Sequence, residues 1–193
     1  MRKFSVRPTL TIKGRTFKGL RGWSGKPFHP PLTDVPIVAY MLVAAFDVLS
    51  RIAGERHTWA TELWHAGTFV MVAGVAASML AMLTGLWDAM KSSEAGTQAR
   101  RTINTHATIM IAVTVLALVD LVWRLTRYDN ELATPTAIAI LSVVVGLLVA
   151  VGATFGGTLV FEYGFNVETA GDDPVWHKSE TDVFPGHGNT TAE

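Results

Sequence analysis

Four long apolar blocks, separated by short polar connections, constrain this chain more than any other feature of its sequence. The blocks run from about residue 35 to 53, 63 to 87, 103 to 123 and 135 to 161. Each is long enough to cross a hydrocarbon core of roughly 30 Å, which needs about 20 helical residues. Lipid offers the backbone no hydrogen-bond partners, so only helices or closed barrels can cross it, and barrel strands are about half this length. The sequence therefore predicts an all-α membrane protein with four transmembrane helices.

Composition agrees with this prediction. Only 17% of the residues are charged and the mean hydropathy is +0.31, which is too apolar for a soluble domain of this length. The connections are short, so neighbouring helices should run antiparallel in an up-down bundle. We divide the chain into a basic amphipathic arm (1–34), a transmembrane domain (35–165) and a flexible acidic tail (166–193). The absence of cysteine excludes disulfides, thiolate metal sites and cysteine nucleophiles.

The distribution of lysine and arginine predicts the orientation in the membrane. If both termini are cytoplasmic, twelve basic residues lie on that side: eight in residues 1–34, together with Lys91, Arg100, Arg101 and Lys178. Four lie on the other side, namely Arg51, Arg56, Arg124 and Arg127. Cytoplasmic segments of membrane proteins carry the excess of positive charge. We therefore expect both termini in the cytoplasm.

Three prolines mark the entry into the first apolar block. Pro30, Pro31 and Pro36 each lack a backbone donor and have a fixed φ, which favours an extended or turning segment. Proline is well tolerated in the first turn of a helix. We therefore predict that the first helix begins at about Pro36, with Thr33 or Asp34 as its cap, and that a rigid turn aims His29 back over the bundle.

Ionisable residues inside apolar blocks are costly in lipid, so they mark sites by default. Asp47 and Arg51 lie on one stripe of the first block, and Asp120 and Arg124 lie on one stripe of the third. The first and third helices should run in the same direction, so these residues should share one depth. The sequence predicts a four-residue ion network, which either clamps the helix ends or forms part of a proton or ion path.

A second polar layer is predicted at the cytoplasmic end. His29 and His106 come to the same depth from different segments, and two such histidines could ligate a haem iron axially. Arg100 and Arg101 would then suit the haem propionates. Alternatively, the histidines could hold a divalent metal together with Asp34 or Glu162. In the plainest alternative they are hydrogen-bonded interface residues. In each case we expect a shared polar cluster, to which Asp88 would also belong.

Several motifs together resemble a bacterial family of small integral membrane proteins known as domain of unknown function 2231. The resemblance covers roughly residues 27 to 167 and rests on four segments: His29-Pro30-Pro31-Leu32 with Pro36, Gly85-Leu86-Trp87-Asp88, His106, and Gly156-Gly157-x-Leu159-Val160-Phe161-x-x-Gly164. It implies a four-helix membrane domain in a bacterial inner (cytoplasmic) membrane. Some relatives are attached to Rieske-type iron-sulfur domains, which implies electron transfer. Where relatives carry a histidine before the last glycine, this chain has Tyr163, and tyrosine can also coordinate ferric haem.

These features predict an accessory subunit of a membrane redox complex that binds b-type haem or a quinone. The chain carries no nucleotide, phosphate or metalloprotease motif, so we expect no independent catalytic activity. A small ion-conducting or transport module and a purely structural assembly subunit are the alternatives. The expected partners are the lipid bilayer and a larger membrane complex, contacted through the arm and the tail. We expect no nucleic-acid binding, because the basic arm has no folded binding module.

Overall fold

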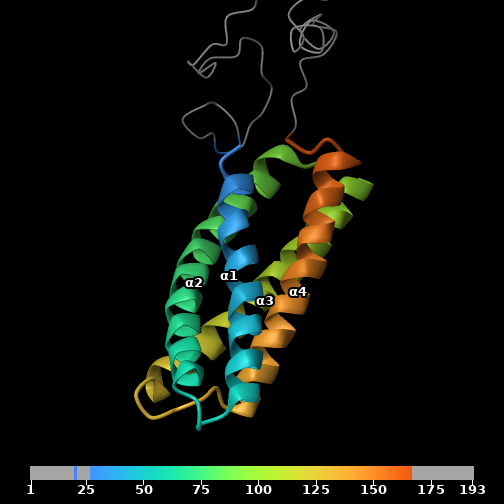
Figure 1. Ribbon diagram of the computed structural model, residues 1–193. Helices are drawn as coiled ribbons and strands as arrows, with labels where there is room; N and C mark the ends of the chain where they lie inside the picture. Colours follow the sequence, from blue (N-terminus) through green and yellow to red (C-terminus); the bar gives the residue numbers. More distant parts are fainter. Residues whose placement is uncertain (1–19, 21–26, 167–193) are drawn as a thin grey trace, which may run out of the picture.

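The part of the chain that the structure describes forms an antiparallel bundle of four helices, shown in Figure 1. The computed structural model describes Leu20 and residues 27–166. Its helices are α1 (His29–Ala53), α2 (Thr58–Ser92), α3 (Gln98–Arg127) and α4 (Thr136–Phe161). The predicted all-α fold is confirmed. The predicted acidic tail and most of the basic arm lie outside the described residues.

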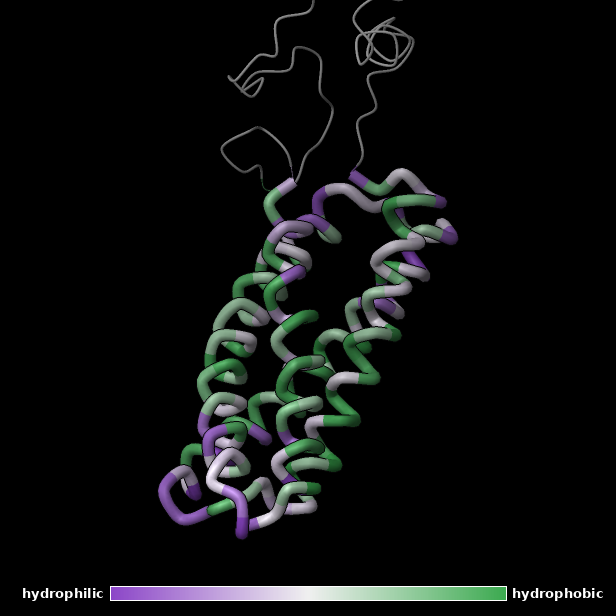
Figure 2. Tube along the Cα trace, in the orientation of Figure 1, coloured by the Kyte–Doolittle hydropathy of each residue, from purple (hydrophilic) through white to green (hydrophobic). Residues whose placement is uncertain are grey.

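All four helices are long and apolar enough to cross a membrane. Figure 2 shows hydrophobic residues along the middle of the bundle and hydrophilic residues gathered towards its two ends. Many large apolar side chains, such as Phe69, Ile140 and Leu147, are exposed on the outside of the helices. Such an exposed apolar surface would be a liability in water, whereas lipid covers it.

The helices are arranged in a ring. α1 packs against α2 and α4, and α3 packs against the same two neighbours, so α1 and α3 face each other diagonally. All four helices contribute to a core at mid-height, which contains Tyr40, Val43, Met71, Val75, Val113, Ala117, Val145 and Val149. Small residues allow close approach, because a Cβ on Gly146 would lie 3.3 Å from that of Ala44.

The start of α1 differs from the prediction. The helix begins at His29, its N-cap is Phe28, and no side chain caps it. Pro30 and Pro31 occupy the first turn, where the missing N–H groups have no intrahelical partner in any case. Pro36 lies inside the helix rather than at its start. His29 is therefore a helical residue, and its direction is set by α1 itself rather than by a rigid turn.

Two other helices, α2 and α3, extend beyond both ends of the apolar blocks predicted for them. α2 begins at Thr58 and continues to Ser92, and α3 extends from Gln98 to Arg127. Hydropathy detects only the apolar part of a helix, while polar residues continue it into the headgroup region. α3 begins where the Thr97 hydroxyl accepts a hydrogen bond of 3.1 Å from the backbone N–H of Arg100.

Candidate functional site

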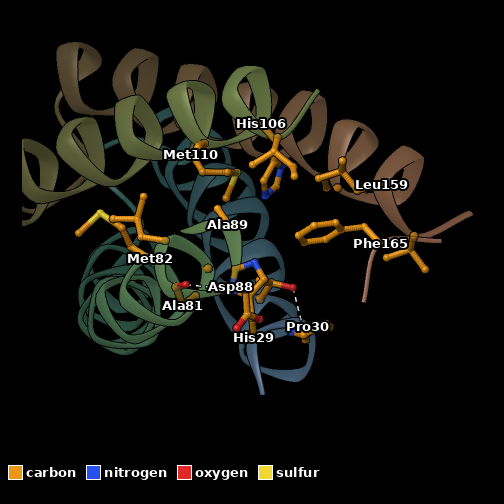
Figure 3. Close-up of a pocket in the computed structure, with 18 of the residues that line it drawn as sticks. His29, Pro30, Ala81, Met82, Asp88, Ala89, His106, Met110, Leu159 and Phe165 are labelled. Atoms are coloured by element: carbon orange, nitrogen blue, oxygen red, sulfur yellow. Dashed lines mark hydrogen bonds between the residues drawn. The ribbon is translucent and has the colours of Figure 1, made fainter. Parts of the chain in front are cut away.

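A cavity of about 340 Å³ lies within the bundle, near one end. It is lined by the N-terminal parts of α1 and α3 and by the C-terminal parts of α2 and α4, together with Phe165 and Asn166. We call this the histidine end, because His29 and His106 both line the cavity. Figure 3 shows their rings on opposite sides, with both pointing into the space between the helices. The walls around them are mainly apolar.

His29 reaches the cavity from α1 and is held by α2. Its Nδ1 lies 2.9 Å from the carbonyl oxygen of Ala81 and 3.4 Å from the hydroxyl of Thr84. The ring rests on Gly85, where an added Cβ would lie only 2.7 Å from Cε1 of His29. The absence of a side chain at Gly85 therefore makes room for the imidazole.

His106 is held in the same way by the other pair of helices. It extends from α3, and its Nδ1 lies 2.8 Å from the carbonyl oxygen of Gly152 on α4. A Cβ on Gly156 would lie 3.2 Å from Cε1 of His106. In both helix pairs the accepting carbonyl precedes the supporting glycine by four residues. The cavity thus has two similar halves, each with one histidine, one carbonyl and one glycine.

These contacts fix the tautomers of the two histidines. A carbonyl oxygen can only accept a hydrogen bond, so each Nδ1 carries a proton and donates it. In a neutral imidazole, Nε2 then keeps its lone pair. No described residue hydrogen-bonds either Nε2. Each ring is oriented through one nitrogen and leaves the other free to bind something in the cavity.

Other residues predicted to bind haem lie elsewhere. Arg100 donates to the carbonyl of Ala89 and to the hydroxyl of Ser93, so it fastens the α2–α3 connection. Arg101 is exposed and donates to the side chain of Gln98. Neither arginine lines the cavity. The exposed Tyr163 does not line it either. Charged groups near a helix end in the sequence need not point inward, and these satisfy local acceptors or solvent instead.

The proposed metal ligands are not gathered around one point. Asp34 lines the cavity with the two histidines, but Glu162 does not. Among the described residues, no three histidine, aspartate or glutamate side chains could hold one metal ion. Glu162 follows the last residue of α4 and is exposed, which removes it from the cavity.

Of the expected shared polar cluster, four members line the cavity, namely His29, Asp34, Asp88 and His106, but among the described residues no hydrogen bond joins these side chains to one another. The buried carboxylate of Asp88 accepts a hydrogen bond of 2.9 Å from the backbone N–H of Leu20. It makes no hydrogen bond to either histidine, and each imidazole instead donates to a carbonyl of a neighbouring helix. Helix carbonyls were available as partners at this depth, and a prediction based on side chains alone overlooked them.

A second polar centre occupies the opposite end of the bundle. Arg124 forms buried salt bridges with Asp47 and with Asp120, where Nε lies 2.8 Å from Oδ1. All three side chains have no exposed surface. We call these residues the ion triad. Thr134 donates to the second oxygen of Asp47 over 3.1 Å, and the guanidinium lies 4.9 Å from the ring centroid of Trp64.

Arg51 does not belong to this centre, contrary to the predicted four-residue network. Its Nε donates to the hydroxyl of Thr136 over 2.8 Å, at an exposed position. Arg51 lies one helical turn beyond Asp47, nearer the end of α1, so its long side chain reaches water. The cation that pairs with Asp47 comes from α3 instead, and it serves both carboxylates.

Sequence reasoning missed the residues that support these two centres. Gly85 and Gly156 were noticed as parts of sequence motifs and not as supports for histidine rings, yet each supports one. In both cases the glycine follows, by four positions, the residue whose carbonyl accepts the histidine hydrogen bond. This shared spacing was a possible signal, but recognising it required knowing which helices pack together. Trp64 and Thr134 gave no signal as ion partners, because neither side chain is ionisable and Thr134 lies outside the apolar blocks.

Comparison with known proteins supports the family assignment and adds no function. No curated protein and no solved structure matches the chain. The family model described as "predicted membrane protein (DUF2231)" matches residues 25–169, which include every residue of the four helices. The two histidines, their supporting glycines and the ion triad all lie within this range. The chain belongs to the DUF2231 family of predicted membrane proteins.

Proposed function

We propose that this protein is an electron-transfer subunit of a membrane complex and binds b-type haem between His29 and His106. The observation that carries the proposal is the pair of imidazoles from diagonal helices, each with Nδ1 bound to a carbonyl and Nε2 left free towards one cavity. When bound, haem supplies a reversible one-electron couple. His29 and His106 would hold the iron through their Nε2 atoms, and the apolar walls of the cavity would give the group a surrounding of low polarity.

The tautomers favour iron over a quinone. A ring that already donates through Nδ1 presents only an acceptor at Nε2, and an acceptor suits a metal ion. The carbonyl oxygens of an oxidised quinone need donors, which neutral His29 and His106 cannot provide in this arrangement. A quinol hydroxyl could donate to Nε2, so a quinol is the second candidate for the same cavity. The volume of about 340 Å³ lies at the lower end of the range for ligand sites.

An absorption spectrum tests the proposal. Protein purified in detergent from haem-replete cells should show a Soret band and, after reduction, the sharp visible bands of six-coordinate low-spin iron. His29→Ala and His106→Ala should each lose the low-spin bands, because one axial nitrogen is missing. His57→Ala is the matched control, since His57 is exposed and precedes α2 at the opposite end of the bundle.

Three outcomes separate the candidates. Loss of the low-spin bands in both cavity variants, with His57→Ala unchanged, supports haem ligation. No Soret band in haem-replete wild-type protein contradicts it. In that case, a quinol that co-purifies with wild-type protein but not with His106→Ala would assign the cavity to the second candidate.

We also propose that the histidine end faces the cytoplasm and that the subunit joins a larger assembly. The support for this orientation is the excess of lysine and arginine in the segments at that end. The support for a partner is the small size of the domain, which carries no catalytic motif of its own. Cysteine labelling from either side of right-side-out vesicles tests the orientation. Native electrophoresis from mild detergent tests the assembly, and recovery only as a lone species would contradict it.

A further inference from the structure

The ion triad has one more acid than base. Asp47 and Asp120 share a single guanidinium, and all three side chains are fully buried. α2 faces the triad with Trp64 and Gly67, and the connection before α4 faces it with Thr134, none of which is charged. If both carboxylates were ionised, the triad would carry one uncompensated negative charge inside the protein. Such a charge is strongly disfavoured in an apolar surrounding.

The two carboxylates differ in how their oxygens are used. Both oxygens of Asp47 accept hydrogen bonds, one from Arg124 and one from Thr134. Asp120 accepts only at Oδ1, from Nε of Arg124. Its Oδ2 is buried and has no hydrogen-bond partner among the described residues. A buried ionised carboxylate needs a hydrogen-bond donor at each oxygen, so Oδ2 of Asp120 is the atom least suited to negative charge.

We propose that the ion triad is a proton-binding site in which one proton, taken from water, resides on Oδ2 of Asp120. Protonation forms one O–H bond and leaves the triad neutral, with Asp47 as the carboxylate that balances Arg124. The carbonyl oxygen of the acid, Oδ1, still accepts from Nε of Arg124. This proton site lies at the opposite end of the bundle from the histidines, so it does not depend on what the cavity binds.

Infrared spectroscopy of protein labelled with carbon-13 at the aspartate carboxyl detects the proton directly. A protonated carboxyl has a carbonyl stretch that is separate from carboxylate bands, and the label shifts it. Besides the triad acids, Asp88 is the only other fully or nearly fully buried carboxyl among the described residues. The experiment therefore starts from Asp88→Asn protein at neutral pH. We expect the labelled band there, and its absence would overturn the proposal.

Charge balance predicts that either single amide substitution removes this band. Asp120→Asn removes the protonated acid itself. Asp47→Asn leaves Asp120 as the only acid beside Arg124, so Asp120 should ionise. A band that remains in both variants would show that the proton lies outside the triad and would overturn the proposal.

Thermal stability then assigns the proton to one acid. An asparagine side chain, like a protonated aspartic acid, is neutral and has a carbonyl acceptor on one atom and a donor on the other, so Asp120→Asn should lower the melting temperature by less than about 3 °C. At position 47 both oxygens accept, and an amide NH₂ would face the donor of Arg124 or Thr134. Asp47→Asn should lower the melting temperature by about 6 °C or more. The reverse order, or failure of Asp120→Asn alone to fold, would overturn the assignment to Asp120.

Discussion

The two ends of the bundle use polar residues in opposite ways. At the ion triad, Arg124 is fully buried against Trp64, and its partners come from α1 and α3. At the histidine end, the rings of His29 and His106 are partly exposed to a cavity, and each uses only one of its nitrogens. One centre joins two helices across the bundle, while the other holds two side chains apart. A closed centre of this kind stabilises the fold, and an open one can bind a ligand.

The largest effect should come from removing the cation of the triad. Arg124→Leu removes the cation that balances the Asp47 carboxylate and the hydrogen-bond donor to Asp120, and breaking a buried ion pair in this way costs about 3–5 kcal/mol. We expect little folded protein, or a melting temperature lower by roughly 10 °C or more, measured in detergent by tryptophan fluorescence. The absorption bands of the proposed haem should be lost only in protein that has also lost its fold.

Arg127→Leu is the control for this substitution. Arg127 is three residues further along α3 and pairs with Glu131 over 3.0 Å, and its side chain is 54% exposed. Exposed pairs of this type contribute at most about 1 kcal/mol. If Arg124→Leu were as stable as Arg127→Leu, the triad would not be a structural clamp.

Adding a methyl group to either glycine that supports a histidine ring should have a smaller effect, and this effect should be confined to the histidine end. Gly85→Ala would place a Cβ 2.7 Å from His29, and Gly156→Ala would place one 3.2 Å from His106. Overpacking typically costs about 1–3 kcal/mol, so both proteins should still fold. We expect weakened or altered cofactor bands in both variants, with the larger change in Gly85→Ala because its contact is closer.

Gly157→Ala is the matched control for the glycine series. Gly157 also lines the cavity, but a Cβ there would meet only Phe161, at 3.9 Å. Its absorption spectrum should equal that of the wild type. Equal spectra for Gly85→Ala and Gly157→Ala would show that the imidazole of His29 is not held against Gly85.

The sequence was sufficient for the architecture and only partly sufficient for the two centres. Four apolar blocks predict four helices because the membrane leaves few other structures. The sequence also placed Asp47, Asp120 and Arg124 at one depth, and His29 with His106 at another. Depth follows from position along each helix. It could not show which way a side chain points, because that depends on the rotation of each helix and on partners such as the carbonyl of Ala81.

Arg51 illustrates this limit and gives the prediction with the smallest effect. It shares a stripe with Asp47, and for that reason the sequence placed it in the ion network. The structure instead gives it an exposed hydrogen bond to Thr136, of a kind that contributes little because water competes for both groups. Arg51→Met should therefore lower the free energy of unfolding by at most about 0.5 kcal/mol, or shift the melting temperature by less than about 2 °C. A loss comparable to that of Arg124→Leu would mean that Arg51 neutralises the triad, which would also remove the need for a proton on Asp120.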